Sequence, residues 1–107
     1  MPDISTFRDG VHPPVVVVEG EVADPSDETL LYDAVCAAVK DGPIAVHVDL
    51  ADVPYLGSVG INALIRACQE ASRLGSEVTV VAASPLVRQV LEITGCDGLL
   101  GLRPDVG

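Results

Sequence analysis

Short β-branched runs alternate with amphipathic helical patterns along this chain of 107 residues, and this alternation limits the possible folds more than any other feature. A strand followed by a helix and a second strand returns as a right-handed crossover, so the order predicts an α/β fold with a mostly parallel sheet of four to five strands. A short final strand is expected at 99–102. The pattern places strands at 4–8, 15–18, 44–50 and 78–83, and helices at 26–40, 58–74 and 85–94.

The third predicted strand indicates that the two faces of the sheet differ. Side chains alternate between faces along a strand, and in 44–50 one set is wholly apolar while the other contains His47 and Asp49. We therefore expect one buried face and one partly polar face, with helices mainly on one face. His47 is then an outward residue with a structural or solvated role. The inward set is Ile44, Val46, Val48 and Leu50, and the outward set is Ala45, His47 and Asp49.

Length and composition indicate a single domain, residues 1–107, with a core of Val, Leu, Ile and Ala. No apolar run approaches the roughly 18 residues needed to cross a bilayer. The N-terminus also lacks the basic and apolar regions of a signal peptide, so we expect a cytoplasmic protein. The formal net charge of −10 argues against binding to nucleic acid or to an anionic membrane, and it favours partners that carry Arg or Lys.

Cysteine and histidine are too few and too scattered to indicate a metal centre. The two histidines, His12 and His47, are distant in sequence, and the three cysteines form no Cys-x-x-Cys pair. Cys36, Cys68 and Cys96 are expected to be reduced core thiols. We therefore expect neither a metal nor a cofactor.

Residues 49–65 lead from the end of an apolar strand, through a tight polar turn, into an amphipathic helix whose first hydroxyl is Ser58. Backbone N–H groups at the start of a helix lack partners within the helix and favour negative charge. A phosphate on Ser58 would be tolerated there and would change what the surface binds, so Ser58 is a candidate switch. The alternative is that Ser58 only caps the helix. Its small neighbours Gly57 and Gly60 are expected to let a partner approach the backbone closely.

The exposed face of this helix and the adjoining loops are the candidate partner surface. Asn62, Arg66 and Gln69 recur at helical spacing from the candidate switch. Asp24 and Asp52 are expected in loops at the same end of the sheet. The alternatives are a solvated helix face for Arg66 and a turn-stabilising carboxylate for Asp24.

In its order of motifs, the chain resembles the STAS domain of bacterial anti-sigma-factor antagonists. That family has a strand ending in Asp-Leu, an aromatic-plus-aliphatic pair, and then Asp-Ser-Ser-Gly at the start of a helix. The resemblance covers 15–102, and the last helix with which the family usually ends is expected to be absent here. The matching segments are Gly20–Pro25, Val48–Leu50, Val53–Leu56, Gly57–Gly60, Ser84–Leu91 and Thr94–Asp97.

The resemblance implies a non-enzymatic protein that binds an anti-sigma factor of the serine-kinase type and thereby frees a sigma factor. In the family the partner phosphorylates the first serine of the motif, which breaks the complex, and a phosphatase restores it. Ser58 corresponds to that serine, whereas Gly57 replaces the preceding Asp and Val59 replaces the second Ser. The expected partner-binding residues are Asp24, Asp52, Gly57, Ser58, Val59, Asn62 and Arg66.

Functions of other classes have weaker signatures. A serine esterase would need Gly-x-Ser-x-Gly, but position 56 is Leu, and neither glycine-rich nucleotide-binding motif occurs. Two alternatives stay open. A redox-sensing module would use a disulfide between Cys68, in the helix that Ser58 begins, and Cys96. A phosphorylation-independent interaction module would keep the fold without the switch.

Overall fold

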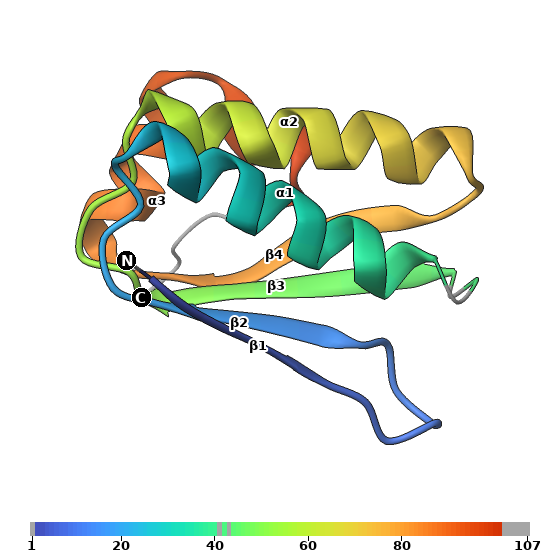
Figure 1. The fold of residues 1–107 in the computed structure, drawn as a ribbon. Helices are drawn as coiled ribbons and strands as arrows, with labels where there is room; N and C mark the ends of the chain where they lie inside the picture. The colour runs from blue at the N-terminus through green and yellow to red at the C-terminus, as the bar shows by residue number, and fades with distance from the viewer. Residues whose placement is uncertain (1, 41, 43, 102–107) are drawn as a thin grey trace.

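The computed structural model describes residues 2–40, 42 and 44–101, and its first seven elements follow the predicted order (Figure 1). The strands are β1 (Asp3–Phe7), β2 (Val15–Glu19), β3 (Ala45–Asp52) and β4 (Glu77–Ala83). The helices are α1 (Pro25–Val39), α2 (Ser58–Arg73), α3 (Pro85–Ile93) and the short α4 (Cys96–Leu99).

The four strands form one sheet in the order β1-β2-β3-β4. β1 and β2 are antiparallel because a hairpin joins them, whereas the crossovers through α1 and α2 make β2, β3 and β4 parallel. The predicted mostly parallel sheet of four to five strands is therefore confirmed. The parallel strands end together at what we call the carboxyl end of the sheet, formed by residues 20–24, 53–58 and 84–86.

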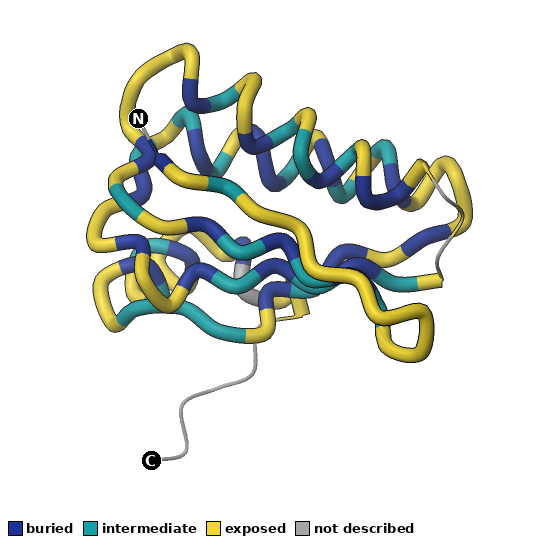
Figure 2. The backbone as a smooth tube through the Cα atoms, turned by 60° about the horizontal axis from the view of Figure 1, so that its bottom comes forward, coloured by how far each residue is buried: buried dark blue, intermediate teal, exposed yellow. Residues whose placement is uncertain are grey.

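α1 and α2 lie side by side across one face of the sheet, as predicted (Figure 1). Burial alternates along the strands beneath them (Figure 2). In β3, Val46, Val48 and Leu50 are fully buried, while His47 and Asp49 on the other face are half-buried. The helices contribute to the core the buried side chains of Leu31, Val35, Ala38, Val39, Ala63, Leu64, Ala67 and Ala71.

Two sequence-based expectations about the fold are wrong. Ile44 is not an inward core residue: it precedes β3 and is 86% exposed, because the ladder with β4 begins only at Ala45. The final strand is also absent at Leu99, which belongs to α4. The next residue, Leu100, contacts the outer edge of β4 through one backbone hydrogen bond: its carbonyl accepts from the N–H of Val80 at 2.8 Å.

Two expectations about the C-terminal residues concern positions that the structure does not describe. Leu102, the last residue of the predicted final strand, and the expected absence of a last helix both lie outside the described residues. Within the described residues, no helix combines the length and the apolar character that a membrane crossing requires.

Candidate functional site

Two loops at the carboxyl end of the sheet are held together by backbone hydrogen bonds, and they position the start of α2. The N–H of Val22 donates to the carbonyl of Tyr55 at 3.0 Å, and the N–H of Gly57 donates to the carbonyl of Val22 at 2.8 Å. This parallel bridge between Val22 and Leu56 extends the β2–β3 pairing beyond the strands. The side chains of Val22 and Leu56 are both buried, so their packing in the core holds the backbone that leads to Ser58 in place.

Ser58 is the first residue of α2, and its side chain is exposed. The N-cap position belongs to Gly57, which has extended backbone and no side chain to offer. The alternative, that Ser58 only caps the helix, is therefore wrong. The carbonyl of Gly57 instead accepts from the N–H groups of Gly60 and Ile61, at 3.0 and 3.2 Å. The arrangement leaves the serine oxygen at the surface, beside the positive end of the helix dipole.

Gly60 has an internal role that the sequence did not reveal. It is buried, and a Cβ atom there would lie 2.3 Å from Cδ1 of Leu56 and 2.9 Å from Cγ1 of Val22. Its small size thus lets α2 pack against the bridged loops, rather than letting a partner approach the backbone. Gly57 is half-buried, with the Tyr55 ring against it, and a Cβ atom there would meet its neighbours at 3.4 Å.

The remaining expected partner residues are mostly exposed, but they are not equally free to bind. Asp24, Asp52, Asn62 and Arg66 are exposed, and Val59 is half-buried. The Asp24 and Asp52 segments both lie at the carboxyl end of the sheet, where the N–H of Gly20 donates to the carbonyl of Asp52 at 3.1 Å. The site therefore combines the start of α2 with the two loops beside it.

Arg66 connects the two helices instead of standing alone on a solvated helix face. Its Nη1 atom lies 2.9 Å from Oε2 of Glu28 in α1. Its guanidinium carbon lies 4.5 Å from the centre of the Tyr32 ring, within cation–π range. Half of the side chain stays exposed, so Arg66 presents charge beside a surface that α1 and α2 share.

A capping box formed by Asp24 and Asp27 holds the turn before α1. Asp24 is the N-cap residue of α1 and is exposed. The buried carboxylate of Asp27 accepts hydrogen bonds from the N–H groups of Asp24 and Ala23, at 2.9 and 3.1 Å. These bonds stabilise the ionised form and lower the pKa of Asp27. A carboxylate at the third helical position is a sequence signal for this role.

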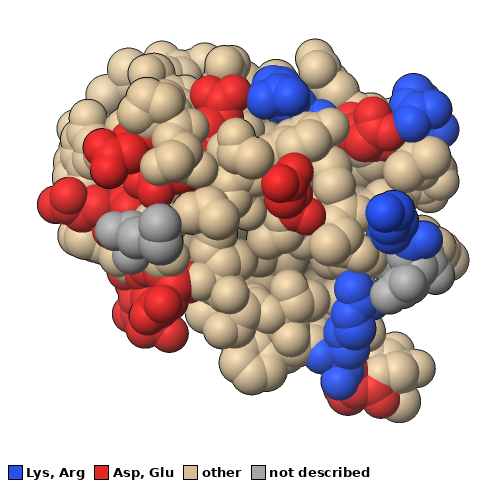
Figure 3. Space-filling view, viewed as in Figure 1, with Lys and Arg blue, Asp and Glu red and all other residues tan. Residues whose placement is uncertain are grey.

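Charge is distributed unevenly over the molecule. Figure 3 shows acidic side chains gathered around the end where the parallel strands finish, while basic side chains lie mainly towards the opposite end. The exposed acids at or next to the carboxyl end of the sheet include Glu19, Glu21, Asp24 and Asp52. Tyr55 stands among them with 47% of its surface exposed, an apolar contact point that the sequence analysis did not single out.

The three cysteines lie on three different helices, and none of them forms a disulfide. Cys68 is half-buried in α2 and Cys96 is buried at the start of α4, with no disulfide between them. Burial raises the pKa of the Cys36 and Cys68 thiols, which disfavours the reactive thiolate. Among the described residues, no three His, Cys, Asp or Glu side chains converge as metal ligands would.

Comparison with known proteins identifies the family. A family model described as "Mlab, STAS domain" matches residues 5–102, so the chain belongs to the STAS-domain family. A crystal structure of an anti-sigma factor antagonist from Mycobacterium paratuberculosis is 33% identical, with a TM-score of 0.77, and the match covers 97% of this chain and 88% of that one.

Two structures of the anti-sigma factor antagonist SpoIIAA share the fold at 16% identity. The unphosphorylated form has a TM-score of 0.71 and matches 91% of this chain and 84% of its own. The phosphorylated form, described as a Bacillus cell fate determinant, has a TM-score of 0.65 and matches 91% and 87%.

Proposed function

We propose that this protein is a cytoplasmic anti-sigma-factor antagonist that binds a serine-kinase-type anti-sigma factor and is released when Ser58 is phosphorylated. The observation that carries the proposal is the exposed Ser58 side chain at the first position of α2, on a backbone held by buried Val22 and Leu56. The likeness to an anti-sigma factor antagonist at 33% identity supports the choice of partner.

The docking surface in this proposal consists of the start of α2 and the two bridged loops. Its acidic surroundings complement a partner that presents Arg or Lys. A phosphoryl group on Ser58 would add about −1.5 to −2 charges at the centre of that surface. A loss of about 3 kcal/mol of binding energy would weaken the complex more than a hundredfold, which suffices for a switch. A phosphatase would restore binding.

The test is direct binding to the anti-sigma factor, with wild type, Ser58→Ala and Ser58→Glu compared by calorimetry. The Glu variant should bind about a hundredfold more weakly than the other two. Equal affinity for all three would reject a switch at Ser58. Equal binding by the Ala variant would also show that the hydroxyl itself is not required for docking.

Gly57 and Val59 favour a second candidate, an interaction module of the same fold that works without phosphorylation. Gly57 supplies no carboxylate beside Ser58, and Val59 supplies no second hydroxyl. Incubation with the partner kinase and ATP, followed by mass spectrometry, separates the two. One added phosphoryl group at Ser58 supports the switch, and an unchanged mass with intact binding supports the constitutive module.

A further inference from the structure

β1 is the edge strand of the sheet, and one of its sides is unused. It pairs with β2 through five residue pairs, from Asp3 with Glu19 to Phe7 with Val15. No described residue pairs with its other side. Edge strands are usually protected by charges or prolines in the strand itself. The middle of β1, Ile4-Ser5-Thr6, contains neither, so among the described residues nothing pairs with its outer N–H and carbonyl groups.

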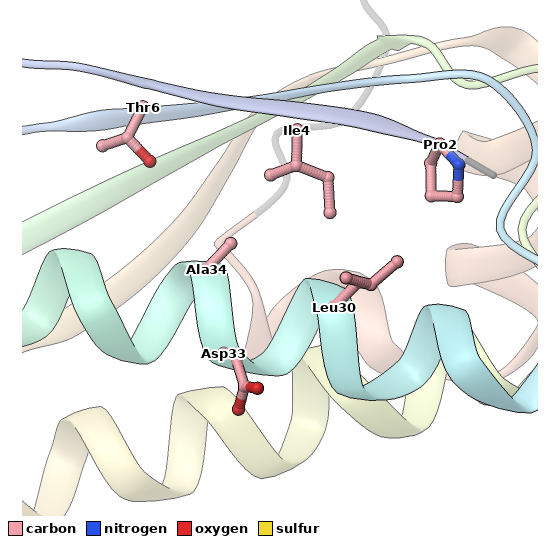
Figure 4. Close-up of a pocket in the computed structure, with 6 residues that line it drawn as sticks. All are labelled: Pro2, Ile4, Thr6, Leu30, Asp33 and Ala34. Carbon is pink, nitrogen blue, oxygen red and sulfur yellow. The ribbon is translucent and has the colours of Figure 1, made fainter.

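A groove runs along this open edge, between β1 and α1. It has a volume of about 440 Å³ and is lined by Pro2, Ile4, Thr6, Leu30, Asp33 and Ala34. In Figure 4, Pro2 and Ile4 project from the strand towards Leu30 and Ala34 on the helix. Leu30 keeps 38% of its surface exposed although it faces this apolar space. An added strand would lie about 4.8 Å from β1, so its inward side chains would cover these apolar groups.

The charge around the groove selects among possible occupants. Asp33 lines the groove from α1 with its carboxylate pointing away from β1 (Figure 4). Asp3 is exposed on the strand. Within residues 2–40, 42 and 44–101, neither carboxylate has an ion-pair partner. A second copy is a poor occupant. Antiparallel pairing of two β1 strands about Ser5 would bring two chains of net charge −10 together along one seam.

We propose that the open edge of β1 and this groove form a second docking surface, which takes an extended basic segment of a partner protein as a fifth strand. Apolar side chains of the segment face Ile4, Leu30 and Ala34, and alternating Lys or Arg side chains face the side on which Asp3 projects. This surface is separate from the one around Ser58, so the proposal does not depend on the proposed function.

The experiment uses the capped peptide Lys-Val-Lys-Val-Lys-Val-Lys, titrated into the full-length ¹⁵N-labelled protein and followed by amide chemical shifts. Binding with a Kd of about 0.1–1 mM is expected. The shifts should be confined to 3–7 and 30–34, and hydrogen exchange at the outward amides of β1 should slow about tenfold at saturation. Peptides N-methylated at the Val or at the Lys positions test strand pairing without altering the protein, and one of the two should bind at least about tenfold more weakly.

Protein variants then test the groove. Leu30→Asp should weaken binding about tenfold and Asp3→Asn about two- to fivefold. Leu86→Asp, an exposed leucine on α3 away from the groove, is the matched control and should have no effect. No shifts at about 5 mM peptide, or equal binding by all N-methylated peptides, would overturn the proposal. Shifts in β1 that depend on protein concentration alone would instead assign the edge to a second copy, and would equally overturn it.

Discussion

At the scale of single residues, two small residues in the first turn of α2 have different roles. Ser58 faces solvent, whereas Gly60, two positions later, is packed against Leu56 and Val22. A change at Ser58 can therefore alter binding while leaving the fold intact, and a change at Gly60 should do the reverse.

Ser58→Glu should leave folding stability within about 1 kcal/mol of wild type. A negative charge in the first turn of a helix is favourable by about 0.3–1 kcal/mol, and nearby acids such as Asp24 and Asp52 oppose part of this gain. Thermal and urea unfolding of wild type, Ser58→Ala and Ser58→Glu measure the effect. A loss of several kcal/mol in the Glu variant would mean that charge at this position unfolds the protein rather than only blocking a surface.

Gly60→Ala should lower the free energy of unfolding by about 1–3 kcal/mol, because the added methyl group meets packed side chains. The matched control is Gly98→Ala, whose new methyl group would have no neighbour within 4 Å. We expect that control to be neutral or stabilising by up to about 1 kcal/mol. Chemical denaturation of both variants gives the comparison, and equal stabilities would contradict the packing argument.

At the scale of elements, α1 and α2 are fixed at their starts by different means. In α1 the carboxylate of Asp27 in the first turn accepts from the preceding backbone, whereas the N-cap residue of α2 is a glycine held by backbone hydrogen bonds. The N-cap residue of α3 is Ser84, whose hydroxyl donates to the carbonyl of Val53 at 2.6 Å and accepts from the N–H of Val87 at 3.4 Å. Each start is thereby tied to the carboxyl end of the sheet.

The stabilising contribution of Asp27 should depend on pH. Its pKa is lowered in the folded state, so its contribution is complete above the unfolded value of about 3.9 and is lost as pH falls through the folded pKa. The melting temperature of wild type should exceed that of Asp27→Asn at neutral pH, and the difference should shrink below about pH 4. Asp33→Asn controls for the loss of one charge from α1. A difference between wild type and Asp27→Asn that grows towards acid would contradict this assignment.

At the scale of the whole molecule, the separation of charge should guide association. A cluster of acidic side chains lies around the proposed docking surface, while most basic side chains lie towards the other end (Figure 3). A partner carrying Arg or Lys would therefore be attracted to the correct end before contact.

Binding of the anti-sigma factor should accordingly depend on salt through its association rate. Raising the ionic strength from about 0.02 to about 0.5 M should slow association about tenfold, with a smaller effect on dissociation. Glu21→Gln together with Asp52→Asn should lower the association rate at low salt. Glu77→Gln, an exposed acid at the start of β4, is the control and should not. Stopped-flow kinetics provide the measurement, and a salt-independent rate would exclude electrostatic guidance.

Local patterns in the sequence were enough to predict the layers of this fold and the place of its candidate switch. The period-two alternation in β3 and the helical spacing after Ser58 depend only on backbone geometry, which is the same in every protein. Motif order likewise indicated the STAS family, which the family match confirms.

The tertiary structure decided which of these residues carry the packing and the pairing. Arg66 meets Glu28 across 38 positions of sequence, and Gly60 meets Val22 through a bridge between two loops. Ile44 and Leu99 also differ from their predicted roles. The β3–β4 ladder begins at Ala45, one residue after Ile44, and Leu99 belongs to the short helix α4. Such contacts depend on how elements stack and in which register. That is a property of the assembled core, which no local pattern of side chains contains.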